Sequence, residues 1–252
     1  MRSLRSTIAP LVLGLAAVLL PSAAGAATIT VLSSFGMSEV INALAPAYQK
    51  QTGNTLVVYY DVGNLLLRRI AGGEPFDVAI LPGDAMDRAV AGVEVDGPTR
   101  VVLARSGIGL AYKAGTPAPD VHDVDAFRRT ILAARSVAYT TAGASGLYFI
   151  SLCERLGIAD QVKAKATVLQ GGRTAELVAS GRAALAAQQM SELLPVAGVA
   201  VVPFPPALQH DTPFVGALAA GSTKRAAGAS LLRFLADPAN AATIRAKGME
   251  PG

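Results

Sequence analysis

The stretch TITVLSSFGMSEVINALAPAYQKQTG, residues 28–53, decides the fold of this chain. Its first six residues are mostly β-branched or apolar, which predicts a strand over 28–33. Apolar residues then recur at helical spacing, at Val40, Ile41, Leu44 and Tyr48. This spacing predicts a helix that ends at Gly53, with a kink or a late start caused by Pro46.

The same alternation of strands and helices continues along the chain. We predict further strands over 55–60, 77–82, 136–140, 166–170, 183–189 and 214–221. We predict helices over 64–73, 83–92, 125–134, 145–157 and 173–181, with two more closing the chain. Short strands separated by helices indicate an α/β fold with mostly parallel sheets. Ligands of such sheets bind beyond the carboxyl ends of the strands.

The first 26 residues have the three-part pattern of a secretory signal peptide. Arg2 and Arg5 precede an apolar run, and small residues at 24–26 form a cleavage site. We therefore expect a periplasmic protein that begins near Ala27. Without the two arginines, 20 basic residues face 18 acidic ones, a net charge of +2. This weak charge and the absence of a basic run argue against a nucleic acid partner.

Small polar residues lie where the first two predicted strands end, at Ser33, Ser34, Gly36, Gly63 and Asn64. They can be turn residues, with Ser38 as the N-cap of the first helix. They can also present hydroxyls and backbone amides to a ligand. Helix N-termini carry partial positive charge, so that ligand is expected to be an anion.

Two further candidate groups lie at strand ends of the second half. Ser145 and Gly146 begin a predicted helix, as a plain cap or as ligand contacts. Gln188, Gln189 and Ser191 follow an apolar strand. Buried amides need partners, so we predict that at least one of these three residues touches a ligand. Cys153, the single cysteine, lies in an apolar segment and is expected to be a buried, inert thiol.

Four segments, in this order and at the right separations, carry a family resemblance. They are ITVLSSFGMSEVINALAPAYQKQTG, IAGGEPFDVAILPGDAMDRAV, GRAALAAQQMSELLPVAGVAVV and ASLLRFLADPANAATIRAKGMEP. The chain resembles the periplasmic molybdate-binding-like family of ABC-transporter solute-binding proteins over residues 28–251. The resemblance implies a type 2 periplasmic-binding-protein fold. In that fold two α/β lobes, each a mostly parallel sheet flanked by helices, are joined by two crossover segments.

The resemblance also implies where the chain divides. It assigns residues 27–104 and 214–252 to lobe 1 and residues 105–213 to lobe 2, after a signal peptide over 1–26. The crossovers are expected near residues 102–108 and 208–215.

The resemblance implies a ligand held by uncharged donors. The first binding serine of molybdate receptors corresponds to Gly36, and the second falls near Gly63, beside Asn64. A tyrosine of the family site is replaced by Gln188 or Gln189. Backbone amides remain at all three places, whereas the hydroxyls are missing. We therefore expect a small anion, either a molybdate-like oxyanion or an organic carboxylate.

The function implied by the resemblance is that of an extracytoplasmic solute-binding protein of an ABC importer. It would capture the small anion between its lobes and deliver it to a membrane permease. We expect a monomer that is not an enzyme and has no catalytic residue, metal or cofactor. The alternative is a secreted hydrolase or isomerase that uses Ser145 or His210. His122 and His210 lack metal-ligand spacing, and GASG at 143–146 is not the G-x-S-x-G motif of serine hydrolases.

Overall fold

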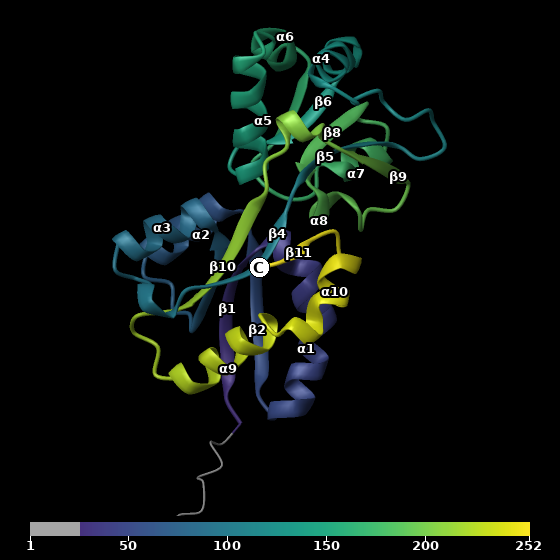
Figure 1. Ribbon diagram of the computed structural model, residues 1–252. Helices are drawn as coiled ribbons and strands as arrows, with labels where there is room; N and C mark the ends of the chain where they lie inside the picture. Colours follow the sequence, from purple (N-terminus) through teal and green to yellow (C-terminus); the bar gives the residue numbers. More distant parts are fainter. Residues whose placement is uncertain (1–25) are drawn as a thin grey trace, which may run out of the picture.

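The computed structural model describes residues 26–252 and has two lobes, one above the other in Figure 1. The predicted signal peptide therefore lies almost entirely outside the described residues. We call lobe 1 the part built on a six-stranded sheet, and lobe 2 the part built on a five-stranded sheet. The predicted two-lobed α/β fold is confirmed.

Lobe 1 has the strand order β11-β4-β10-β3-β1-β2. Its strands are β1 (Thr28–Ser34), β2 (Thr55–Asp61), β3 (Val78–Pro82), β4 (Val101–Ser106), β10 (Thr212–Leu218) and β11 (Glu250–Pro251). Its helices are α1 (Ser38–Thr52), α2 (Gly63–Ala71), α3 (Gly83–Ala91), α9 (Arg225–Leu235) and α10 (Ala241–Ala246). Short 3-10 turns lie at η1 (Phe35–Met37), η2 (Gly97–Thr99) and η4 (Pro238–Asn240).

Lobe 2 has the strand order β7-β6-β8-β5-β9. Its strands are β5 (Ile108–Lys113), β6 (Val137–Thr140), β7 (Ala166–Leu169), β8 (Leu185–Gln189) and β9 (Val199–Pro203). Its helices are α4 (Val124–Ala133), α5 (Ala144–Arg155), α6 (Ala159–Lys163), α7 (Ala175–Ala179) and α8 (Met190–Leu193), with a 3-10 turn η3 (Pro206–Leu208).

Each sheet is mixed rather than mostly parallel. In lobe 1, β1 pairs in parallel with β2 and β3, but β10 pairs antiparallel with β3 and β4. In lobe 2, β6 is parallel to β7 and β8, but β5 is antiparallel to β8 and β9. The strands that run against the others of their sheet are β10 and β11 in lobe 1 and β5 in lobe 2. Of these, β5 and β10 lie next to the two crossings between the lobes, where no βαβ connection sets their direction.

Apolar side chains fill both faces of each sheet. Along β1, Ile29 and Val31 belong to the core beneath α1 and α9, whereas Leu32 belongs to the core beneath α2 and α3. Because a strand alternates its side chains between two faces, a sheet covered on both sides needs such a run of apolar residues. In lobe 2, α4, α5 and α6 cover one face, and α7 and α8 cover the other.

The first helix runs unbroken over Ser38–Thr52 with Pro46 inside it, and Gly53 ends it in a left-handed conformation. The predicted end of the helix is confirmed. The alternative in which Ser38 is the N-cap is wrong, because η1 precedes the helix and Met37 is its N-cap.

The chain crosses between the lobes at Gly107, after β4, and again before β10. Gln209 connects the two crossings: its side-chain amide accepts a hydrogen bond from the Ile108 amide (2.7 Å) and donates one to the Ile108 carbonyl (3.0 Å). These crossings bring the strand ends of both lobes together.

Candidate functional site

A cleft lies between the lobes, at the carboxyl ends of the strands. Lobe 1 lines it with Ser34, Val62, Gly63, Pro82 and Phe214. Lobe 2 lines it with Thr140, Gly143, Ala144, Ser145, Gln188, Gln189 and Glu192. Its cavity is about 10 Å³, which is room for about one water molecule. The lobes are therefore closed on each other.

Three helices begin at this cleft without a capping side chain. Val62 is the N-cap of α2, Pro82 of α3 and Gly143 of α5, and none of the three accepts a hydrogen bond from the helix with its side chain. Helix starts contribute amide donors and partial positive charge. Amides from both lobes thus favour an anion in the cleft. Ser145 is not the cap of α5, because the helix begins one residue earlier.

Five of the predicted site residues line this single cleft: Ser34, Gly63, Ser145, Gln188 and Gln189. Asn64 lies beside it and lines a small neighbouring cavity together with Arg88, Ala142 and Leu147. There its side-chain oxygen accepts a hydrogen bond from Arg88 (2.6 Å).

The other four predicted residues do not line the cleft. Ser33 is fully buried and donates its hydroxyl to the Ser34 carbonyl (3.2 Å). Gly36 lies against the ring of Phe214, and a Cβ there would come within 2.3 Å of Cζ. Gly146 lies against the Thr140 carbonyl, where a Cβ would come within 1.8 Å of the oxygen. The two glycines are explained by these close approaches.

Ser191, the fourth, is buried in the first turn of α8. Its backbone amide donates to the Ser106 hydroxyl (3.4 Å), and its own hydroxyl has no hydrogen-bond partner among residues 26–252.

Both glutamine amides bond to the protein itself. The Gln188 oxygen accepts from the Thr174 amide (2.9 Å) and hydroxyl (2.8 Å), and its nitrogen donates to the Gly172 carbonyl (2.8 Å). With its amide oriented to satisfy both ends, Gln189 accepts from the Thr212 hydroxyl (2.8 Å) and donates to the Ser106 carbonyl (2.8 Å). Gln188 thus holds the loop after β7, and Gln189 holds the crossings.

Glu192 was not predicted, although it lines the cleft. It lies in the first turn of α8, which faces lobe 1 (Figure 1), and is only 7% exposed. Burial raises the pKa of its carboxyl to about 7. The Gln189 backbone amide, the charge of Arg173 and the Gln188 side chain act in the opposite direction. A carboxyl of this pKa can accept or release a proton near neutral pH.

An ion pair across the lobes was also not predicted. Arg173, on the loop between β7 and α7, donates from Nη2 to Oε1 of Glu39 in the first turn of α1 (2.6 Å). Both side chains are about a quarter exposed. The cleft therefore has charged groups beside it, in addition to the uncharged donors that the family resemblance implied.

The two histidines lie elsewhere. His122 is exposed and bonds to Asp120 (2.6 Å) and Asp123 (3.1 Å). His210 is exposed and stacks on the ring of Tyr148. Neither histidine lines the cleft, so of the two residues named in the alternative, Ser145 and His210, only Ser145 lies there. Within residues 26–252, no cluster of His, Cys, Asp or Glu side chains is arranged to hold a metal ion.

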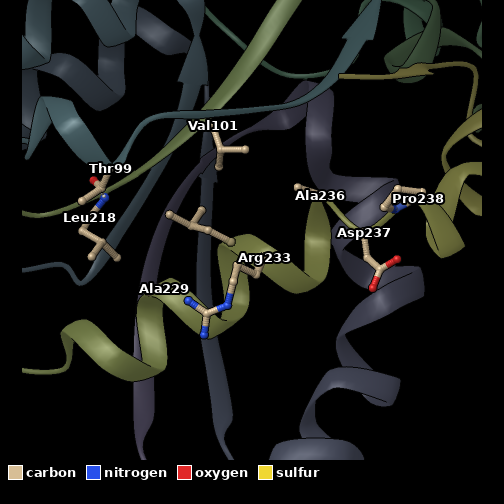
Figure 2. Close-up of a pocket in the computed structure, with 9 residues that line it drawn as sticks. Thr99, Val101, Leu218, Ala229, Arg233, Ala236, Asp237 and Pro238 are labelled. Carbon is tan, nitrogen blue, oxygen red and sulfur yellow. Dashed lines mark hydrogen bonds between the residues drawn. The ribbon is translucent and has the colours of Figure 1, made fainter.

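A larger cavity, of about 520 Å³, lies on lobe 1 between β4 and α9 (Figure 2). Val101, Leu218, Ala229, Leu232 and Ala236 make it mainly apolar, with Arg233 and Asp237 as its charged residues. It lacks a buried acid or nucleophile, and the cleft is the better candidate site. Over the described part of the chain, no helix has the length and apolar character needed to cross a bilayer.

A family model described as bacterial extracellular solute-binding protein matches residues 29–250. With its two lobes and its cleft, the chain belongs to this family.

This chain is similar to a named isomerase and, in fold, to two anion-binding proteins of known structure. An aconitate isomerase from Pseudomonas sp. is 37% identical over 231 residues, which cover 89% of this chain and 88% of the relative. The periplasmic molybdate-binding protein of Azotobacter vinelandii has a TM-score of 0.73 at 18% identity, over 88% of this chain and 98% of that one. The sulfate-binding protein SubI of Mycobacterium tuberculosis has a TM-score of 0.71 at 16% identity, over 89% and 87% of the two chains. At such low identity the two binding proteins are evidence for the fold alone.

The isomerase corrects one sequence-based expectation. We expected a protein that is not an enzyme, but a relative with more than a third of its residues identical over most of both chains is named as one. The expectation of a purely non-enzymatic receptor is therefore contradicted.

Proposed function

We propose that this protein is an isomerase that acts on a small unsaturated polycarboxylate, with aconitate as the candidate substrate. The observation that carries the proposal is the buried carboxyl of Glu192 in a cleft otherwise lined by amides, hydroxyls and apolar groups. A site that only captures anions gains nothing from a carboxylate, because like charges repel. A site that moves a proton needs such a group.

The chemistry follows from the substrate. Aconitate is a propene that carries one carboxylate on each carbon. Removing a proton from its methylene carbon leaves an electron pair that spreads over the three carbons and the attached carboxylates. Returning a proton to the opposite end moves the double bond and can change its geometry. No atom is gained or lost, and one carboxyl can both take the proton and return it.

The surroundings of Glu192 fit this role. Uncapped starts of α2, α3 and α5 supply amide donors for substrate carboxylates and for the negative charge that spreads onto them. Lobes that close again around a bound substrate would exclude bulk water, which strengthens those interactions. The 37% identity to an aconitate isomerase independently supports this substrate class.

The test is incubation of the purified mature chain with trans-aconitate, followed by proton NMR. The proposal predicts formation of cis-aconitate, with inhibition by the saturated analogue tricarballylate and none by equal concentrations of molybdate or sulfate. If aconitate is not interconverted at even a single pH between about 6 and 8, the proposal is contradicted, since Glu192 changes its protonation in that range.

A second candidate function is delivery of a small anion to an ABC permease, in keeping with a periplasmic location. The family match and the likeness to molybdate- and sulfate-binding proteins favour it. It predicts that the closed, ligand-bound chain associates with a permease and stimulates ATP hydrolysis, which the isomerase activity alone does not require.

A further inference from the structure

Arg173 and Glu39 form the one ion pair that joins the two lobes among residues 26–252. Every other ion pair of the described chain lies within one lobe. Arg173 follows β7 in lobe 2, and Glu39 lies in the first turn of α1, five residues after Ser34 at the end of β1.

The loop that carries Arg173 is fixed by a residue of the cleft. Gln188 bonds to Gly172 before Arg173 and to Thr174 after it, at 2.8 to 2.9 Å. The loop that carries Arg173 is therefore attached to the end of β8, and the charge of Arg173 acts on the Glu192 carboxyl. A positioned cation of this kind is suited to binding a carboxylate.

The closed cleft cannot contain a tricarboxylate, because its cavity is about 10 Å³. Admission of such a ligand requires the lobes to separate, and separation must break the contact of Arg173 with Glu39. The guanidinium is then left beside the cleft without its partner. A substrate carboxylate offers the guanidinium the same kind of charged acceptor oxygen that Glu39 offered, at 2.6 Å from Nη2, and can also accept from it with both oxygens.

We propose that Arg173 binds a carboxylate of the substrate, and that Glu39 is the internal carboxylate that occupies Arg173 while the cleft is empty. This inference rests on the proposed function in taking a polycarboxylate as the ligand. The same exchange sets specificity, since an uncharged solute does not displace Glu39 from Arg173.

The test is calorimetric titration of the mature chain with tricarballylate, which has no double bond to move. Arg173→Gln is expected to weaken binding roughly 10- to 100-fold, as for loss of a charge-assisted bidentate pair. Arg173→Lys keeps the charge but not the planar guanidinium. Its affinity for tricarballylate is expected to lie between those of the wild type and Arg173→Gln. Glu39→Gln removes the internal competitor and is expected to tighten binding by roughly threefold or more.

The matched control is Glu154→Gln. Glu154 also pairs with a cation, Lys163 (3.4 Å), but it lies on the outside of lobe 2. This variant removes one negative charge without touching the cleft and is expected to bind tricarballylate like the wild type. Thermal unfolding of each variant establishes that it is folded before titration.

These measurements test the role of Arg173 separately from the proposed isomerase activity. Wild-type affinity in Arg173→Gln, or a Glu39→Gln affinity no higher than that of Glu154→Gln, overturns the inference even when aconitate is isomerised. The expected changes in affinity without any isomerisation support the inference and overturn the proposed isomerase. A wild-type chain that binds no tricarboxylate overturns both.

Discussion

Glu192 is a carboxyl whose environment disfavours its charge. Burial raises its pKa to about 7, above that of an ordinary glutamate. As the base that takes a proton from substrate, it must be ionised before the reaction starts. Arg173 is the charged group that acts on it, and this charge favours the ionised form.

The pH dependence of catalysis follows from this. We expect kcat/KM for aconitate to rise about tenfold per pH unit below about pH 7 and to level off above it. Stopped samples analysed by NMR at a series of pH values give the profile. A rate that is flat from about pH 5 to 8 would show that the limiting group is not a carboxyl with a raised pKa.

At the level of single residues, sequence patterns found the part of the site that depends on strand ends. Ser34, Gly63 and Ser145 could be predicted because each follows a strand or begins a helix. Glu192 could not, because a carboxylate is unfavourable in a site that only binds anions. The contact of Arg173 with Glu39 joins residues 134 positions apart, and no local pattern encodes it.

In lobe 2, the side chain of Lys165 binds the carboxyl end of helix α4. Nζ of Lys165 donates to the carbonyls of Ile131 (2.8 Å), Leu132 (2.6 Å) and Ala134 (2.7 Å), at the last turn of α4. The positive charge also interacts favourably with the negative end of the helix.

We expect Lys165→Met to lower the free energy of unfolding by about 1–3 kcal/mol, because it leaves partly buried carbonyls without their donor. Urea unfolding measures the change. Lys163→Met is the matched control, since Lys163 makes one exposed contact with Glu154 and should matter little. Equal effects of the two substitutions would contradict this role of Lys165.

In lobe 1, Asp77 joins β1 to the segment before α9. Its carboxylate accepts from the Thr30 amide (2.8 Å), the Ser222 hydroxyl (2.8 Å) and the Lys224 ammonium (3.0 Å). Burial raises the pKa of Asp77, but these hydrogen bonds lower it more, so the net pKa lies below its ordinary value.

The sign of the pH effect follows from that lowered pKa. Asp77 stabilises the fold fully above its unfolded-state pKa, near 4, and this contribution is lost as the pH falls through the lower folded-state pKa. We expect Asp77→Asn to cost about 1–3 kcal/mol at about pH 7 and progressively less in acid. Urea unfolding of the wild type and of Asp77→Asn, at about pH 7 and in acid, tests this. A difference in unfolding free energy that is the same at both would contradict it.

Most elements could be predicted from apolar periodicity, since long helices and buried strands repeat their pattern clearly. The short strands β9 and β11 could not. β9 lies at the edge of its sheet and is only half buried, and β11 has two residues. The antiparallel direction of β10 and β5 depends on the crossings between lobes, which strand patterns alone do not specify.

At the scale of the whole molecule, the two lobes bring strand ends from distant parts of the chain to one cleft. Gly107 and Gln209 lie at the crossings, and the Gln209 amide holds the two crossing segments together. The family resemblance predicted this arrangement. It did not predict that the cleft is closed to a cavity of about 10 Å³, or that Arg173 and Glu39 form an ion pair across it. Binding must therefore be coupled to opening and closing of the lobes.

The most direct test of proton transfer in the cleft is the kcat of Glu192→Gln for aconitate. Glutamine has nearly the same shape but cannot take a proton, so the lobes should still close on tricarballylate with at least wild-type affinity. We predict that kcat falls by about 10²- to 10⁴-fold. Retention of the wild-type kcat by Glu192→Gln would contradict the account.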